Sequence, residues 1–129
     1  MKLLLDTHVL LWALGEPDSL STAERAAIAD EANAVVASVA SLWEIAIKQQ
    51  SGKLKLSAPA IDWLPPLIDS SGIGTLDITQ RHALAAGALP NHHRDPFDRM
   101  LVAQALADEF ILVTRDRAIK RYGAPTLEA

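Results

Sequence analysis

Short apolar segments alternate along the chain with longer segments that carry helix start and stop signals. Residues 3–5 are apolar throughout, which is typical of a parallel strand covered by helices on both faces. The pattern predicts strands at residues 3–5, 34–37, 73–76 and 110–113, with a small edge strand at 125–127. It predicts helices at residues 7–14, 21–32, 39–50, 59–71, 79–89, 95–108 and 116–122. Strands that alternate with helices favour a parallel sheet in an α/β sandwich.

One of the predicted helices contains a signal against its own continuity. Pro65 and Pro66 are adjacent near the middle of residues 59–71. Proline lacks the backbone donor that a helix interior needs, and its ring clashes with the preceding turn. We therefore expect a break or kink at this point, after which Pro66 can restart a helix at its first position.

Four acidic residues occupy positions that share one edge of the predicted sheet. Asp6 and Asp116 come directly after strands. Glu44 lies near the start of one helix, and Asp98 lies in the first turn of another. Ligands of parallel sheets bind at the carboxyl ends of the strands, where the returning helices begin, so we expect the four carboxylates to converge. Each acid alone also has a structural explanation as a cap or solvated position, and Asp95, directly before a proline, fits a helix cap best.

The converging carboxylates need a positive counter-charge, because like charges in close contact cannot all stay ionised. The chain has no cysteine, which excludes a thiolate zinc site, a disulfide framework and a cysteine nucleophile. A donor set made only of oxygen atoms favours Mg²⁺ or Mn²⁺, as one ion or two. Such a site suits phosphodiester hydrolysis, in which the metal activates the attacking water and stabilises the leaving oxygen.

The basic residues are unevenly distributed, although the net charge is −4. Lys48, Lys53 and Lys55 follow one another without an intervening acid. Half of all the basic residues fall in the last third of the chain, at Arg94, Arg99, Arg115, Arg117, Lys120 and Arg121. A basic rim around an acidic pocket attracts a phosphate backbone despite a negative total charge. The alternative is that these are ordinary solvated side chains.

The histidines form no zinc or catalytic motif. His92 and His93 are neighbours, but adjacent side chains in a loop rarely ligate one ion together, so we expect them to position the loop or contact substrate. His8 and His82 are expected to be structural. The sequence has no Gly-rich phosphate loop and no GxSxG motif.

Residues 2–14 form an apolar stretch after a lysine, as in a short signal peptide. Asp6 and His8 interrupt the stretch and no small-residue cleavage site is evident, so we interpret it as a strand followed by a helix. We find no segment long and apolar enough to span a bilayer. The absence of cysteine is compatible with a reducing cytoplasm, which is the location that we expect.

Four segments resemble the PIN-domain ribonucleases, specifically the VapC-type toxins of bacterial type II toxin–antitoxin systems. They are LLLDTHVLLWAL (3–14), SLWEIAIKQQSGKLKL (41–56), LPNHHRDPFDRMLVAQAL (89–106) and LVTRD (112–116). Together they span almost the whole chain, and HRDPFDRMLVAQA is the specific one. The resemblance implies a single PIN domain over residues 1–129, folded as a three-layer α/β/α sandwich around a mostly parallel sheet.

The resemblance also implies an activity, a site and partners. The activity is metal-dependent endoribonuclease cleavage of RNA by the toxin of a toxin–antitoxin pair, with Mg²⁺ or Mn²⁺ as the cofactor. The metal-binding and catalytic acids would be Asp6, Glu44, Asp98 and Asp116. Thr114 and Asp95 are expected to support them, and Arg99 and His93 to contact RNA. The implied partners are a second copy of the chain in a homodimer and a cognate antitoxin that occupies the site.

The antitoxin is expected to bring a basic residue to the acids and an apolar segment to a groove beside residues 10–12 and 42–47.

Two other functions fit parts of the pattern. A phosphatase of the haloacid dehalogenase kind also begins with an aspartate after a strand, but it uses a second aspartate two residues later, where this chain has His8. A non-catalytic binding module would use the acids only to hold a structural ion. Asp98→Asn separates this last case, because a structural role predicts loss of folding and a catalytic role predicts a folded, inactive protein.

Overall fold

The computed structural model describes residues 1–92 and 95–127, so the predicted RNA contact of His93 lies outside the described residues. Its sheet contains strands in the order β3-β2-β1-β4-β5, and each neighbouring pair is parallel. The strands are β1 (Lys2–Leu5), β2 (Ala34–Ser38), β3 (Gly74–Leu76), β4 (Ile111–Val113) and β5 (Thr126–Leu127). The predicted α/β fold with a parallel sheet is therefore confirmed.

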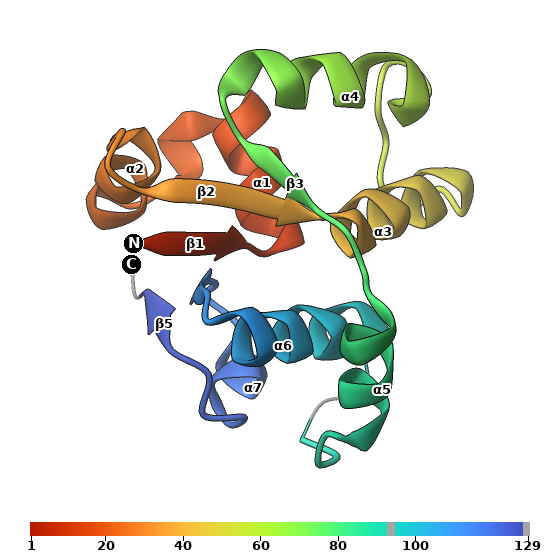
Figure 1. Cartoon of the computed structure of the whole chain (residues 1–129). Coiled ribbons are helices and arrows are strands. Elements are labelled where there is room, and N and C mark those ends of the chain that lie inside the picture. The colour runs from red at the N-terminus through yellow and green to blue at the C-terminus, as the bar shows by residue number, and fades with distance from the viewer. Residues whose placement is uncertain (93–94, 128–129) are drawn as a thin grey trace.

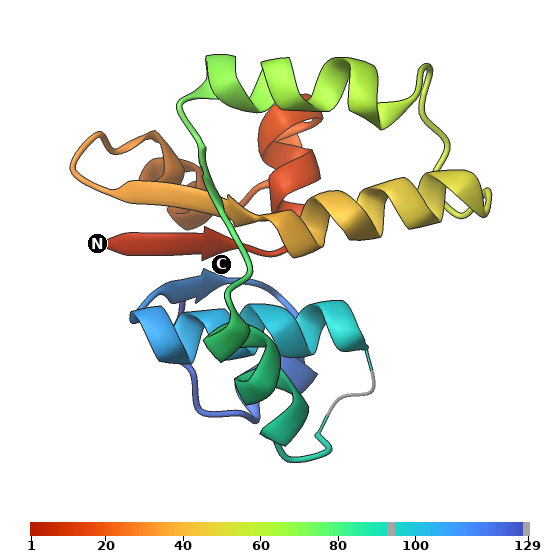
Figure 2. The same cartoon turned by 45° about the vertical axis from the view of Figure 1, so that its right-hand side comes forward.

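Helices connect these strands and cover both faces of the sheet (Figure 1). They are α1 (Thr7–Gly15), the 3₁₀ turn η1 (Pro17–Ser19), α2 (Thr22–Ala29), α3 (Val39–Gln50), α4 (Ala60–Ser71), α5 (Gln80–Ala88), α6 (Pro96–Asp108) and α7 (Arg117–Lys120). Figures 1 and 2 show α1, α3 and α4 on one side of the sheet and α5, α6 and α7 on the other. Across the part of the chain that the structure describes, no helix has the length and apolar character to cross a membrane.

The central strand β1 divides the core into two layers. Its leucines are fully buried, and they alternate between the layers because successive side chains of a strand point to opposite faces. Leu3 and Leu5 pack with residues of α1, α3 and α4, whereas Leu4 packs with residues of α6 and α7. The prediction that residues 3–5 are buried on both faces is confirmed.

Helix α4 continues through Pro65 and Pro66, so the predicted break is wrong, and the kink that we gave as its alternative stays a prediction. Both prolines lie on the exposed side of the helix. The carbonyl groups that would have accepted their missing N–H bonds belong to Ile61 and Asp62, which are also exposed, so water can take the place of the lost donors. The opposite side of the helix is buried through Ala60, Leu64 and Ile68. Burial of this apolar face compensates for the bonds that the prolines remove.

Two helices are shorter than predicted. α2 ends at Ala29, where Asn33 Nδ2 donates to the carbonyl oxygen of Ala27 over 2.9 Å. The carboxylate of Asp30 accepts from the backbone of Ala32 over 2.9 Å, which turns the chain toward β2. α7 spans only Arg117–Lys120. Hydrogen bonds from side chains to nearby backbone groups therefore end α2 earlier than the helix propensity of its sequence predicts.

Candidate active site

A pocket of about 370 Å³ lies at the carboxyl ends of the central strands, and all four predicted acids line it. They are Asp6, Glu44, Asp98 and Asp116. Asp95, Lys48 and Arg115 line the same pocket. The expected convergence is therefore present in the structure, and the residues come from four separate parts of the chain.

Asp6 connects the end of β1 to the start of α1. Its Oδ1 accepts from the backbone N–H of Val9 over 2.8 Å, and its own N–H donates to the carbonyl oxygen of Val113 over 3.1 Å. Burial raises the pKa of Asp6, and hydrogen bonds from Thr114 and Val9 offset only part of this rise. The charge of Asp116 raises the pKa further. Asp6 is thus a buried carboxyl group that a bound cation would stabilise in its ionised form.

Thr114 interacts with two of the acids. It is fully buried directly after β4, and its side chain lowers the pKa of Asp6 by favouring the ionised carboxylate. Its Oγ1 accepts from the backbone N–H of Asp116 over 3.1 Å. Asp116 in turn caps α7, since its Oδ1 accepts from the N–H of Ala118 over 2.8 Å. Thr114 therefore holds the backbone of Asp116 and favours the ionised form of Asp6.

Glu44 is buried on α3 with a partner at each oxygen. The hydroxyl of Thr7 donates to Oε1 over 2.5 Å, and the ammonium of Lys48 donates to Oε2 over 2.5 Å. The hydrogen bond to Glu44 raises the pKa of Lys48, burial opposes this, and the charges of Asp95 and Asp98 raise it further. Lys48 therefore supplies positive charge to the carboxylates. Sequence reasoning missed this role, although the spacing of four residues on a predicted helix was a usable signal.

Asp95 and Asp98 open α6 at the pocket. Asp95 caps the helix, with its Oδ1 accepting from the N–H groups of Phe97 and Asp98 over 2.9 and 3.3 Å. Pro96 follows at the first helical position, as the cap signature predicts. Asp98 lies in the first turn. Asp95 thus serves as a helix cap and also lines the pocket.

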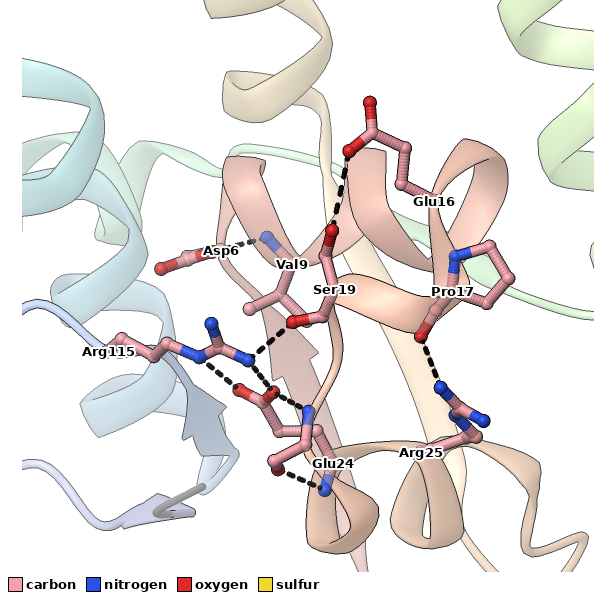
Figure 3. Close-up of polar contacts among 9 residues, drawn as sticks. Asp6, Val9, Glu16, Pro17, Ser19, Glu24, Arg25 and Arg115 are labelled. Carbon is pink, nitrogen blue, oxygen red and sulfur yellow. Dashed lines mark hydrogen bonds and ion pairs between the residues drawn. The ribbon is translucent and has the colours of Figure 1, made fainter.

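Arg115 also lines the pocket, and its guanidinium is bound to Glu24, which lies outside the pocket (Figure 3). The guanidinium donates to the two carboxylate oxygens over 2.6 and 3.3 Å and to the carbonyl of Ser19 over 2.8 Å. It also lies 4.6 Å from the ring centroid of Trp12. Burial would raise the pKa of Glu24, but hydrogen bonds from Arg115 and Ser21 outweigh it and lower that pKa. The two residues are 91 positions apart, so no sequence pattern indicated the pair.

Arg99, a predicted RNA contact, is not among the residues that line the pocket. Its guanidinium donates to the carbonyl oxygens of Ala86, Leu89 and Pro90 over 2.9, 3.0 and 3.0 Å. It also lies within 3.3 Å of the Tyr122 hydroxyl. These bonds join α6 to the end of α5. Contact with RNA stays a prediction.

An apolar groove of about 340 Å³ adjoins the acidic pocket and shares His8 and Trp12 with it. α1, the segment after α3 and α4 form its walls through Leu11, Leu14, Leu54, Leu56, Trp63 and Leu67. The groove was expected beside residues 10–12 and 42–47. Leu10 is instead fully buried in the core, and Trp43 and Ile47 are exposed on α3, outside the groove.

The acidic side chains of the pocket fit a hard divalent cation, because they all offer carboxylate oxygen. Burial raises the pKa of Asp6, so a nearby positive charge would stabilise its ionised form. Within residues 1–92 and 95–127, however, no group of three or more acidic or histidine side chains is placed closely enough to hold an ion. Both oxygens of Glu44 are hydrogen-bonded to protein groups. The chemistry of the residues therefore fits a metal, and Glu44 has to exchange a partner to bind one.

The family model of the PIN domain matches residues 3–125 of the chain. The chain therefore belongs to the PIN domain family, as its motifs predict, and the haloacid dehalogenase alternative is set aside. It is 34% identical over 123 residues to Ribonuclease VapC22 of Mycobacterium tuberculosis, covering 95% of this chain and 92% of that protein.

Solved structures share the fold. The DNA-bound VapBC structure from Salmonella typhimurium matches with a TM-score of 0.71 and 18% identity over 99% of this chain and 97% of that one. VapBC2 from Rickettsia felis, bound to a DNA fragment from its promoter, matches with a TM-score of 0.70 and 16% identity over 99% and 98% of the two chains. At these identities the likeness supports the fold of this chain.

Proposed function

We propose that this chain is a metal-dependent endoribonuclease that acts as the toxin of a toxin–antitoxin pair. The observation that carries the proposal is the convergence of Asp6, Glu44, Asp98 and Asp116 on one pocket. The relative from Mycobacterium tuberculosis is named a ribonuclease, and the structural neighbours are VapBC proteins, which supports the same activity. RNA in the cytoplasm is the proposed substrate.

In this proposal the four acids would hold Mg²⁺ or Mn²⁺, and the chemistry that the bound ion would supply is activation of a water molecule and stabilisation of charge on the leaving oxygen. The chain contributes by orienting the acids before substrate arrives. Backbone N–H groups fix one oxygen of Asp6 and one of Asp116, and Thr114 interacts with both residues. The hydroxyl of Thr7 donates to Oε1 of Glu44 and so holds that side chain in place. Ligands that are already oriented by neighbouring groups need less reorganisation when they bind a metal.

The experiment is cleavage of total cellular RNA by purified protein in Mg²⁺, in Mn²⁺ and in EDTA, with the product ends mapped. We expect discrete products with either metal and none in EDTA. Asp98→Asn is the matched control, since it keeps the size of the side chain and removes one carboxylate. Full turnover in EDTA would contradict the proposed mechanism.

We also propose an antitoxin partner that places an apolar segment in the groove and a basic residue in the pocket. The groove and the pocket share His8 and Trp12, so one short segment can reach both. A partner cation would satisfy the carboxylates through charge-assisted hydrogen bonds in place of the metal. We expect the partner to inhibit cleavage and to lose inhibition when its basic residues in this segment are removed. Full inhibition by a partner without those residues would show that bulk alone blocks the site.

A homodimer is proposed from the family resemblance. Exposed apolar side chains on α3, Trp43 at 63% and Ile47 at 42%, give it a candidate surface. Sedimentation of the chain alone should give the mass of two copies, and Trp43→Ser should shift the protein toward one copy. A monomer at all concentrations would contradict the dimer and leave the nuclease proposal unaffected.

A further inference from the structure

Two cations line the pocket among the described residues, and they differ in what holds them. Arg115 is hydrogen-bonded to Glu24 and to the Ser19 carbonyl, neither of which belongs to the four acids. Lys48 is bound to Glu44 itself, with Nζ 2.5 Å from Oε2. The side chain of Lys48 is 37% exposed, whereas that of Glu44 is only 4% exposed. The positive charge on Glu44 therefore comes from a side chain that has a path to solvent.

The two partners of Glu44 also differ in how they are anchored. Thr7 sits at the start of α1, is buried, and its Oγ1 lies 3.0 Å from Ser41 Oγ as well as 2.5 Å from Glu44 Oε1. Lys48 reaches Oε2 through a flexible four-carbon stem and binds as a point charge. The ammonium can leave Oε2 by rotating toward solvent, while the bond from Thr7 keeps Glu44 in place. Oε2 can thus change partners without a change in the backbone.

We propose that Lys48 is an internal counter-cation that competes with the divalent metal for Glu44 and so sets the metal affinity of the pocket. The inference rests on the proposed function, since it concerns the same metal site. A divalent ion and an ammonium group repel each other when both approach one carboxylate oxygen. Lys48 must therefore leave Oε2 when a metal takes it, and its displaced ammonium stays at the pocket rim. There it can meet a phosphate oxygen of RNA.

The test is calorimetric titration with Mn²⁺ in the absence of RNA, on the full chain, with folding of each variant checked by circular dichroism. Lys48→Met keeps the length of the stem and removes the charge. We expect it to bind Mn²⁺ about tenfold more tightly than the unmodified chain, because a nearby like charge is gone. Lys48→Arg keeps the charge and should stay within about threefold of the unmodified chain. Lys53→Met, an exposed position outside the pocket, is the matched control and should change nothing.

A second measurement uses a non-cleavable single-stranded RNA with and without Mn²⁺. With saturating Mn²⁺, Lys48→Met should weaken RNA binding and reduce the slope of log affinity against log salt by about 0.7, the value for one lost phosphate contact. Without metal, where Lys48 stays on Glu44, the same change should affect RNA binding much less, and an equal loss in both conditions would contradict displacement of Lys48 by the metal. In a Glu44→Gln background, Lys48→Met should give a clearly smaller gain in Mn²⁺ affinity, because the shared ligand is gone.

The outcomes separate the two proposals. Absence of Mn²⁺ binding by the folded, unmodified chain would overturn the proposed function and this inference together. If the unmodified chain binds Mn²⁺ and Lys48→Met binds it equally or more weakly, the competition by Lys48 is wrong and the proposed function stands.

Discussion

Two buried glutamates, Glu24 and Glu44, meet cations in opposite ways. Glu24 is fully buried and Glu44 is 3% exposed. Each is paired with a basic residue at short range, over 2.6 Å to Arg115 and over 2.5 Å to Lys48. By burial and distance alone the two pairs look equivalent. Their surroundings give them different consequences.

Both members of the Glu24–Arg115 pair are held by further contacts with neighbouring groups. Its carboxylate also accepts from the backbone N–H of Ser21 over 2.8 Å in a capping box, and Arg115 adds bonds and ring contact to neighbouring groups. The planar guanidinium matches a carboxylate through two donors, which suits a permanent pair. Of the Glu24 pair only Arg115 lines the pocket, whereas both Glu44 and Lys48 line it together with the other acids, and the lysine is flexible. We infer that Glu24 stabilises the fold and that Glu44 exchanges its cation in function.

The largest effect is expected from removing an acid of the pocket. Asp98→Asn should lower RNA cleavage by roughly 10³-fold, because a metal ligand supplies several kcal/mol of transition-state stabilisation. Folding should be retained, since Asp98 is only half-buried in the first turn of α6 and its helix is capped by Asp95. Cleavage rates and circular dichroism check both parts. Loss of folding would support the structural-ion alternative instead.

The Glu24–Arg115 pair should contribute more to the free energy of unfolding than the Glu44–Lys48 pair. Glu24→Gln should lower the free energy of unfolding by about 1–3 kcal/mol, because a buried hydrogen-bonded charge is replaced and one donor of Arg115 loses its acceptor. Glu44→Gln should change it by less than about 1 kcal/mol, since the lysine makes a single hydrogen bond to Glu44, whereas Arg115 makes two to Glu24. Urea unfolding in EDTA measures both, with Glu31→Gln at an exposed position as the control. Equal losses at the two glutamates would remove the distinction.

The sequence predicted the acidic residues of the pocket better than the basic residues that lie beside them. Asp6, Asp95 and Asp116 all cap helices, and Asp6 and Asp116 also come after strands, so local signals were enough to place them. Lys48 could have been found from its spacing to Glu44. Nothing local indicated Glu24 and Arg115, because the pair exists only once α2 meets the end of β4.

The prolines of α4 are a case in which a local signal is overridden by long-range packing. Pro65 and Pro66 are strong local signals, yet the predicted break is absent. The buried face of α4 decides the outcome through contacts with α1 and α3, which local propensity does not include. The order of strands in the sheet is likewise a property of long-range packing.

The pH dependence of stability should have opposite signs at Asp6 and Glu24. The pKa of Asp6 is raised from 3.8, so the folded state holds this proton more tightly and stability falls as pH rises through the raised value. The pKa of Glu24 is lowered from 4.5, so its contribution is complete above that value and is lost as pH falls through the lowered one. Thermal unfolding in EDTA against pH checks this. Asp6→Asn should remove the first effect alone, and a steeper decline in that variant would contradict it.

The smallest effect is expected at Arg99. The sequence predicts that Arg99→Ala weakens RNA binding, by roughly threefold for one exposed contact. Its bonds to the end of α5 predict in addition a loss of about 1–2 kcal/mol in stability. Binding measured well below the unfolding temperature, over a range of salt concentrations, separates the two. Unchanged affinity with reduced stability would assign Arg99 to the fold alone.

The exchange of cations at Glu44 is tested most directly by comparing cleavage by Glu24→Gln and Glu44→Gln, with Mg²⁺ present and rates divided by the folded fraction. We expect Glu24→Gln, although less stable, to cleave RNA at close to the rate of the unmodified chain per folded molecule. Glu44→Gln should be as stable as the unmodified chain and cleave roughly 10³-fold more slowly. Full activity in Glu44→Gln would contradict the role assigned to this pocket.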